Sequence, residues 1–164
     1  MPKVEELNKI ERHEFIHVLA PVFEHSPWIA ARTVAKRPFA NRNELYAALR
    51  ETVMKASDDE KLCLIRAHPD LVGREVLTRE SQNEQASAGL GELSPEEIGR
   101  FRIYNEGYRK RFGFPFVICV RLNKKQTILD AFTVRLQNSK EQEIETALRE
   151  IFKIAELRLR DLVE

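Results

Sequence analysis

The sequence has only two cysteines, too few for a disulfide framework to hold the fold together. Cys63 and Cys119 each lie within an apolar run, so both are predicted to be buried, reduced thiols in a reducing compartment. The sequence also lacks any apolar run near the roughly 20 residues of a transmembrane helix, which argues against a membrane span. It has no excess of one charge, since 27 basic residues offset 26 acidic ones. This balance gives no reason to expect a nucleic acid or a membrane as a partner.

The length and the apolar pattern favour one all-α domain, a helical bundle that spans residues 1–164. Apolar residues recur at helical spacing along most of the chain. One such stripe consists of Leu45, Ala48, Leu49, Thr52 and Val53. A capping-box pattern at Ser57 predicts the start of one further helix. The run Ser94-Pro95-Glu96-Glu97 predicts the start of a long one, and the last helix is expected from about Lys140.

One segment, residues 113–120, breaks this helical pattern. It is apolar throughout, shows no periodicity and contains Pro115. Such a segment is either a short strand or an extended buried stretch. No second segment offers itself as a strand partner, and for this reason the all-α class is preferred.

The most familiar motif of the chain is His13-Glu14-Phe15-Ile16-His17. It matches the H-E-x-x-H pattern of zinc peptidases, in which two histidines bind the metal and the glutamate acts as a base. At about 100° per residue, however, both histidines fall opposite the apolar stripe that contains Phe15 and Leu19. Zinc ligands instead point into a cleft. Two solvated histidines on a surface helix are the preferred interpretation, and no metal site is predicted.

His68 is the histidine best placed for chemistry. The proline that follows it, Pro69, ends the helix and puts the imidazole on a chain reversal. Imidazole is the side chain best suited to exchange protons near neutral pH. The alternative is a histidine that caps the last carbonyls of its helix. The local sequence leaves both interpretations open.

Residues 81–85 also have two interpretations. Ser81 and Glu84 have the spacing of a capping box, which would place Glu84 and Gln85 in the first turn of a helix. The free N–H groups of such a turn also attract an anionic ligand. A structural role and a functional role are both compatible with this pattern.

Arg158 is predicted to point toward the core. It lies seven residues after Ile151 and fourteen after Ile144, on the apolar stripe of the last helix. A buried guanidinium is costly unless a carboxylate or several acceptors meet it. Arg158 is therefore either part of a buried salt bridge, or a side chain whose stem is buried and whose charged end reaches the surface, or a clamp for an anionic ligand.

Taken together, the motifs resemble those of one family, the OHCU decarboxylases, where OHCU stands for 2-oxo-4-hydroxy-4-carboxy-5-ureidoimidazoline. The matching segments, in chain order, are residues 23–30 (FEHSPWIA), 37–39 (RPF), 67–71 (AHPDL), 81–85 (SQNEQ), 88–90 (AGL), 111–118 (RFGFPFVI) and 150–159 (EIFKIAELRL). Each motif alone is weakly specific. Their order, from about residue 7 to residue 163, is strongly specific.

The resemblance implies an all-helical enzyme that converts OHCU to (S)-allantoin, the last step from urate, without a metal or an organic cofactor. It implies catalytic roles for His68 and Glu84. It implies a substrate-binding role for a larger set, Pro69, Ser81, Gln85, Phe116, Val117, Ile118, Cys119 and Arg158. It further implies a homodimer and a functional association with urate oxidase and hydroxyisourate hydrolase, the two preceding enzymes.

These residue types fit the chemistry that the resemblance implies. The substrate is a small anionic ring, and loss of carbon dioxide leaves an electron pair that the adjacent ring C=N absorbs. His68, oriented by Glu84, would handle the proton of the substrate hydroxyl during carbon–carbon cleavage. The chain ends without a peroxisomal tripeptide and begins with polar residues, so a cytoplasmic enzyme is expected.

Two competing functions remain to be tested. One is a zinc peptidase that uses His13 and His17. The other is a non-catalytic helical interaction module whose residues 112–120 bind a partner peptide. The second predicts exposed aromatic side chains in that segment and has no use for an inward-pointing Arg158.

Overall fold

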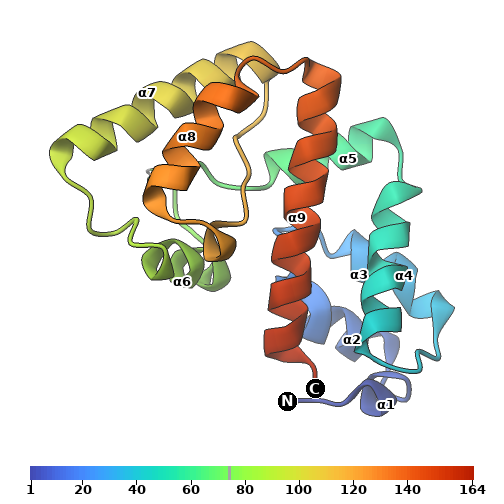
Figure 1. Cartoon of the computed structure of the whole chain (residues 1–164). Coiled ribbons are helices and arrows are strands. Elements are labelled where there is room, and N and C mark those ends of the chain that lie inside the picture. Colours follow the sequence, from blue (N-terminus) through green and yellow to red (C-terminus); the bar gives the residue numbers. More distant parts are fainter. Residues whose placement is uncertain (74) are drawn as a thin grey trace. The chain divides into compact units, whose positions relative to one another are not determined.

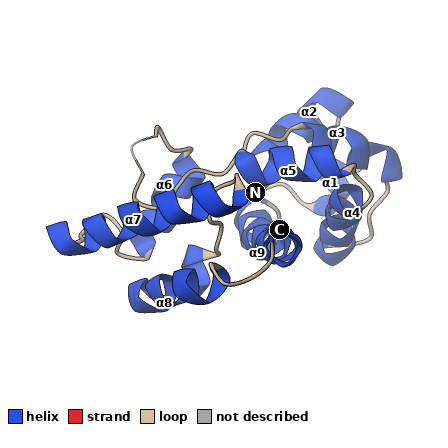
Figure 2. Cartoon of the chain, turned by 90° about the horizontal axis from the view of Figure 1, so that it is seen from above, coloured by secondary structure: helices blue, strands red, loops and turns tan. Residues whose placement is uncertain are grey.

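The computed structural model describes residues 1–73 and 75–164, and the regular elements in these ranges are all helical (Figures 1 and 2). No strand occurs in either range, so the all-α prediction is confirmed. The helices of this part of the chain also include none that is both long and apolar enough to cross a membrane. The chain divides into two compact units, residues 1–67 with 152–164, and residues 68–151. The long helix α9 (Lys140–Leu162) contributes residues to both.

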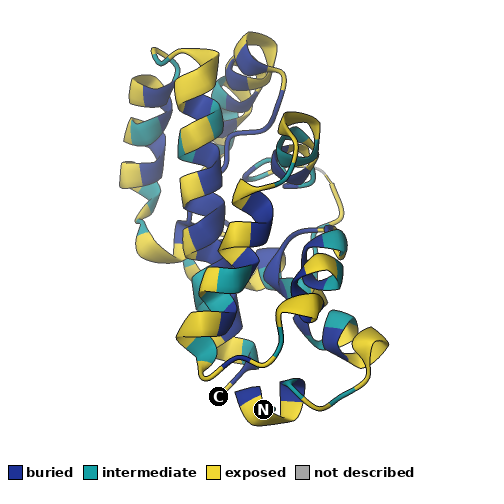
Figure 3. Cartoon of the chain, turned by 90° about the vertical axis from the view of Figure 1, so that its right-hand side faces the viewer, coloured by how far each residue is buried: buried dark blue, intermediate teal, exposed yellow. Residues whose placement is uncertain are grey.

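The first unit holds most of the short helices. Before α9 it contains α1 (Val4–Leu7), α2 (Arg12–Leu19), the 3-10 helix η1 (Ala20–Val22), α3 (Trp28–Thr33), the 3-10 helix η2 (Val34–Lys36), α4 (Arg42–Met54) and α5 (Asp58–Arg66). Helix α3 packs against α2 and α4, and the hydroxyls of Thr33 and Thr52 meet at 2.7 Å between α3 and α4. The predicted stripe of α4 is buried at Leu45, Leu49 and Val53. Figure 3 shows the pattern more widely, since helices carry a buried face and an exposed face.

The C-terminal part of α9 completes the first unit. The hydroxyl of Tyr46 donates to the carbonyl of Phe152 at 3.1 Å, and Arg42 donates to the carbonyl of Val163 at 2.9 Å. The N–H of Glu164 donates to the carbonyl of Pro2 at 3.0 Å, so the two chain ends lie together, as Figure 1 shows. These bonds tie the last residues of the chain to its first helices.

The helix starts follow the capping signals in the sequence. At the start of α5 the Ser57 hydroxyl accepts from the Glu60 N–H, and the Glu60 carboxylate accepts from the Ser57 N–H, each at 3.1 Å. Helix α7 (Pro95–Phe112) begins with the same box at Ser94. The predicted capping box at Ser57 and the predicted helix start at Ser94 are confirmed, and α9 begins at Lys140 as predicted.

The second unit is built around an aromatic core. It contains α6 (Arg79–Ser87), α7, the 3-10 helix η3 (Val120–Leu122), α8 (Lys125–Arg135) and the first part of α9. The rings of Phe116 and Phe132 stack with centroids 3.8 Å apart, and Tyr108 meets Phe116 edge-on at 5.3 Å. Helix α7 ends at Gly113, whose φ of 80° is the left-handed conformation that glycine adopts without strain.

The aperiodic segment after α7 is an extended buried stretch and not a strand. Phe114, Phe116 and Cys119 are at most 1% exposed. The aromatic side chains of this segment are therefore core residues. The interaction-module hypothesis required them to be exposed, so the structure disagrees with it.

The two cysteines differ in exposure. Cys119 is buried as predicted, but Cys63 is exposed, so the prediction for Cys63 is wrong. Helix α5 buries Leu64 and Ile65, the next two residues. Because successive helical residues point about 100° apart, this placement turns Cys63 toward solvent.

Candidate active site

His68 lies just beyond the end of α5, on the chain reversal that Pro69 predicts. Helix α5 ends at Arg66, and the N–H of Ala67 still donates to the carbonyl of Cys63 at 3.0 Å. His68 comes next and is 7% exposed. A largely buried imidazole at a helix end is well placed for proton exchange in a site that limits contact with water.

Side chains of α7 hold the turn that follows Pro69. Arg109 donates from Nε to Asp70 Oδ1 at 2.8 Å, and Asn105 donates from Nδ2 to the carbonyl of Leu71 at 2.8 Å. The Asp70–Arg109 pair is partly exposed, whereas Asn105 is 6% exposed. Two consecutive residues of the turn are thus fixed by one helix, which restricts the backbone next to His68.

Gln85 links the same turn to α6. Its Oε1 accepts from the N–H of Val72 at 3.2 Å, and Val72 has a φ of 55°, which is unusual for a β-branched residue. The side-chain NH₂ of Gln85 finds no acceptor in the described ranges of the chain. One end of this amide therefore shapes the turn, and the other end is available to a ligand.

Helix α6 begins three residues before the predicted start. The N-cap is Thr78, whose hydroxyl accepts from the N–H of Ser81 at 3.2 Å. The predicted capping box of Ser81 and Glu84 is therefore wrong, because Ser81 already lies in the first helical turn. Glu84 and Gln85 lie in the second turn, away from the free N–H groups of the helix start.

The buried face of α6 is entirely polar. Ser81, Glu84 and Gln85 are buried, at 6%, 9% and 8% exposure, and no apolar residue of the helix is. The three residues share one face, since they are spaced by three and four positions. Burying polar groups disfavours folding unless partners meet them. A helix that buries only polar side chains therefore points to a functional surface.

The segment that precedes η3 lies beside this polar face. Helix α6 packs against η3. The negative charges of the Glu150 and Glu84 carboxylates affect the pKa of the Cys119 thiol. Burial raises the pKa of Cys119, and these two carboxylates raise it further. Glu150 also accepts from the Cys119 N–H at 3.1 Å, and the packing of α6 against η3 brings the predicted residues of α6 near the extended segment.

Arg158 belongs to the first unit and points inward, as predicted. It is 3% exposed, and its guanidinium donates to Glu24 Oε1 at 2.8 Å and to the carbonyl of Pro21 at 3.0 Å. Glu24 is 2% exposed. The buried salt bridge that the sequence left open is thus present, and the guanidinium is held in one orientation.

The two histidines of the H-E-x-x-H pattern are both exposed on α2, as predicted. Phe15 and Leu19 form the buried face of this helix. Within residues 1–73 and 75–164, no group of three or more histidine, cysteine or acidic side chains is arranged to hold a metal ion. The geometry gives no support to a zinc peptidase.

A cavity of about 350 Å³ opens on the α7 side of the turn. It is lined by Asp70, Val72, Gly73, Glu75, Arg102, Asn105, Glu106 and Arg109. None of these residues belongs to the predicted site. The Oδ1 of Asn105, which faces no hydrogen-bond partner among the described residues, is buried here. Val72 connects the cavity lining to the polar face of α6, because its N–H donates to Gln85.

Several buried polar residues escaped the sequence-based prediction. These are Glu24, Asn105, Arg135, Glu143 and Glu150. A signal existed for two of them, because Glu143 and Glu150 are seven residues apart on α9 and border its apolar stripe. Glu24 and Asn105 carried no local signal, since their partners lie 134 and 34 positions away along the chain.

Comparison with known proteins adds a second line of observation. The family model described as OHCU decarboxylase matches residues 8–160. The chain belongs to the OHCU decarboxylase family. An OHCU decarboxylase of Halalkalicoccus jeotgali is 43% identical over 159 residues, which cover 97% of this chain and 90% of the relative. An OHCU decarboxylase of Amia calva is 39% identical over 163 residues, which cover 97% and 93%.

Solved structures agree with this family assignment. A crystal structure of (S)-allantoin synthase superimposes with a TM-score of 0.81 at 33% identity, covering 98% of this chain but only 54% of that one. A crystal structure of OHCU decarboxylase in the presence of (S)-allantoin gives a TM-score of 0.71 at 26% identity, covering 84% and 91%. This member of the OHCU decarboxylase family thus shares the fold of both proteins.

Proposed function

We propose that this chain catalyses the decarboxylation of OHCU to (S)-allantoin, the last step of urate degradation to allantoin. The observation that carries the proposal is the match to the OHCU decarboxylase family over residues 8–160. The polar buried face of α6 supports it, because a catalytic surface explains why a short helix buries no apolar side chain.

In this proposal His68 moves the proton. It accepts the proton of the substrate hydroxyl as the bond to the carboxylate breaks, and the carbon dioxide leaves. The electron pair passes to the adjacent ring C=N, so the reaction needs no cofactor as an electron sink. A proton is then delivered to one face of the ring, which gives the (S) product. Glu84 orients the imidazole and stabilises its charged form.

The remaining residues bind the substrate. Ser81 and the NH₂ of Gln85 offer hydrogen bonds from the buried face of α6, and Pro69 shapes the wall next to His68. The extended segment Phe116, Val117, Ile118 and Cys119 offers its backbone. Arg158 is proposed to bind a polar arm of the substrate, and the Glu24 contact supports a fixed orientation of its guanidinium. These contacts serve positioning more than chemistry.

The deciding experiment generates the unstable substrate in place from urate, with urate oxidase and hydroxyisourate hydrolase. This protein is then added, and circular dichroism follows the optical activity of the product. We expect rapid formation of optically active allantoin, slowed by about 10²–10⁴-fold in His68→Asn. Decay at the spontaneous rate to racemic product, with folded wild-type protein present, contradicts the proposed function.

We further propose a cytoplasmic homodimer that acts with urate oxidase and hydroxyisourate hydrolase. One relative supports the association of activities. A uric acid degradation bifunctional protein of Bacillus sp. is 43% identical over 162 residues, which cover 99% of this chain but 32% of that protein. Light scattering of the purified protein tests the dimer, because a monomeric mass would contradict it.

A further inference from the structure

The extended segment Phe116–Cys119 poses a hydrogen-bonding problem. Its residues are 1–8% exposed, yet in the described ranges it pairs with no strand. Buried backbone N–H and C=O groups need partners, because leaving them without one opposes folding. In this segment, buried charged side chains take the place of a neighbouring strand.

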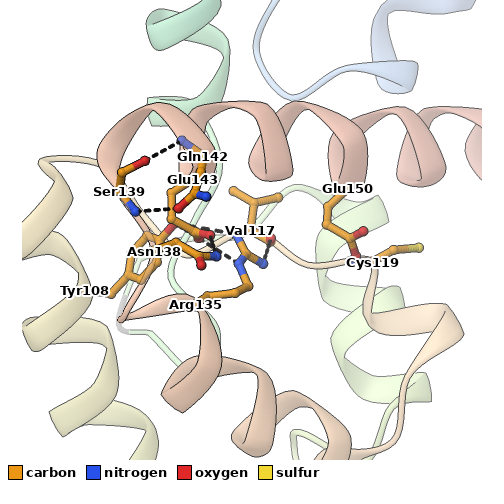
Figure 4. A network of polar contacts seen from close by, with 9 residues as sticks. All are labelled: Tyr108, Val117, Cys119, Arg135, Asn138, Ser139, Gln142, Glu143 and Glu150. Atoms are coloured by element: carbon orange, nitrogen blue, oxygen red, sulfur yellow. Dashed lines mark hydrogen bonds and ion pairs between the residues drawn. The ribbon is translucent and has the colours of Figure 1, made fainter.

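Arg135 of α8 binds the first half of the segment. Its NH1 donates to the carbonyl of Val117 at 2.6 Å, and its guanidinium carbon lies 4.2 Å from the ring centre of Phe116 (Figure 4). The side chain is only 8% exposed. One planar guanidinium thus fixes both a peptide group and the adjacent aromatic ring.

Glu143 of α9 fixes the orientation of Arg135. Its Oε1 accepts from Arg135 Nε at 2.7 Å and from the Tyr108 hydroxyl at 2.5 Å, and its Oε2 accepts from Asn138 at 2.9 Å. Glu143 is fully buried. Because both oxygens of the carboxylate accept hydrogen bonds, Glu143 is itself fixed and holds Arg135 with NH1 aimed at Val117.

Glu150 holds the other end of the segment. Its Oε1 accepts from the N–H of Cys119 at 3.1 Å, and the residue is 7% exposed (Figure 4). Glu150 lies two helical turns after Glu143 on α9, so the same face of one helix serves both ends of the segment. Two carboxylates of α9 therefore set the register of residues 117–119.

Ile118 lies between the two anchors. Its N–H and C=O make no hydrogen bond within the described part of the chain, although the residue is 8% exposed. The two anchors therefore restrain Val117 and Cys119, while the N–H and C=O of Ile118 between them can still form hydrogen bonds. This is the arrangement expected where a backbone is held ready for a ligand.

We propose that Arg135 and Glu150 are positioning residues, which hold the Phe116–Cys119 segment at its two ends so that its backbone can bind substrate. The proposal rests on the proposed function for the identity of that substrate. Neither residue touches the reacting atoms. Their effect on turnover passes through the backbone of residues 117–119.

Glu150 gives the cleanest test, because one replacement keeps the contact and another removes it. Glu150→Gln retains an oxygen that accepts from the Cys119 N–H, whereas Glu150→Leu does not. For Glu150→Leu we expect kcat/KM to fall by about tenfold to a hundredfold, the scale of a misplaced binding group. The larger part of the loss should appear in KM. Glu150→Gln should keep most of the wild-type kcat/KM.

Arg135 is tested without leaving a charge stranded. Arg135→Met alone would bury an unpaired Glu143, so the variant is combined with Glu143→Leu. The double variant also frees the carbonyl of Val117 and should raise KM as Glu150→Leu does. Thr33→Val is the matched control, because it removes a buried hydroxyl in the first unit that bonds to Ile29 and Thr52. It should lower the melting temperature and leave kcat/KM unchanged.

Hydrogen exchange of the peptide that contains residues 117–120 gives a readout that does not depend on activity. Its amides should exchange faster in Glu150→Leu than in Glu150→Gln. Unchanged exchange, or a wild-type kcat/KM in folded Glu150→Leu, overturns the positioning role. An equal loss of kcat/KM in Thr33→Val overturns it as well. If the wild-type protein forms no optically active allantoin, the proposed function fails, and the exchange rates alone decide the positioning role.

Discussion

Arg158 and Glu24 form a buried ion pair across 2.8 Å, with side chains 4% and 1% exposed. The carbonyl of Pro21 accepts a second N–H of the same guanidinium. Removing one partner of such a pair is far more costly than removing both, because the remaining charge stays buried without its counter-ion. Because of this asymmetry, replacing one partner alone tests whether the pair is buried within the first unit.

Glu24→Ala is expected to lower the free energy of unfolding by about 3–5 kcal/mol, since it strands the Arg158 charge in the interior. Urea denaturation measures the change. The control is Glu156→Ala, which breaks an exposed pair with Arg160 at 2.7 Å on the same helix. That control should cost less than about 1 kcal/mol. Equal losses in the two variants would mean that the Glu24–Arg158 pair is not buried in solution.

Glu84→Gln tests whether this carboxylate acts through His68. The change keeps the size of the side chain and removes its charge, so we expect turnover to fall while the melting temperature stays near that of the wild type. In a His68→Asn background the same change should add little, because two groups that act as a unit are non-additive. Glu80→Gln, at a half-buried position one helical turn before Glu84, is the control. If Glu84→Gln lowered turnover in the His68→Asn background by as much as it does in the wild type, Glu84 would act independently of His68.

Asn105→Ala tests the anchor of the turn after His68. The variant leaves the carbonyl of Leu71 without its donor in a buried position. We expect a loss of about 1–3 kcal/mol in unfolding free energy, the usual cost of an unsatisfied buried group. Turnover should also fall, since the backbone beside His68 loosens. Arg109→Met removes partly exposed ion pairs with Asp70 and Glu75, so a larger loss there than in Asn105→Ala would point to these ion pairs as the main anchor.

The sequence allowed the local features of the fold to be predicted. The buried stripe of α4, the capping box at Ser57, the helix start at Ser94 and the helix stop at Pro69 all depend on neighbours within one or two turns. The start of α6 was missed because two residues, Thr78 and Ser81, both suit an N-cap, and local spacing does not decide between them. The exposure of Cys63 was missed because a run of consecutive apolar residues does not show which of them face the core when the run is helical.

The site was predictable in its residue types more than in its contacts. The seven-residue spacing showed that Arg158 points inward, but its partner Glu24 lies 134 positions away along the chain. The extended segment remained ambiguous for the same reason. Its hydrogen-bond partners are side chains of α8 and α9, and no periodicity in residues 113–120 reports on them. Long-range polar pairing is a property of the packed chain, which sequence spacing does not encode.

The two thiols should differ sharply in reactivity. Burial, with smaller contributions from the carboxylates of Glu150 and Glu84, raises the pKa of Cys119. A raised pKa lowers the thiolate fraction at any given pH, and the thiolate is the reactive form. Iodoacetamide at about pH 8 should therefore modify Cys63 rapidly in the native protein and leave Cys119 unmodified until the chain unfolds.

Mass spectrometry of the labelled peptides measures both rates, and Cys63→Ser supplies the control, since its native form should take up almost no label. Glu150→Leu adds a further expectation. It removes one carboxylate and the bond to the Cys119 N–H, so Cys119 should become more reactive than in the wild type. Equal labelling of both cysteines in the native wild-type protein would show that the segment around Cys119 opens to solvent, which a firmly anchored segment does not do.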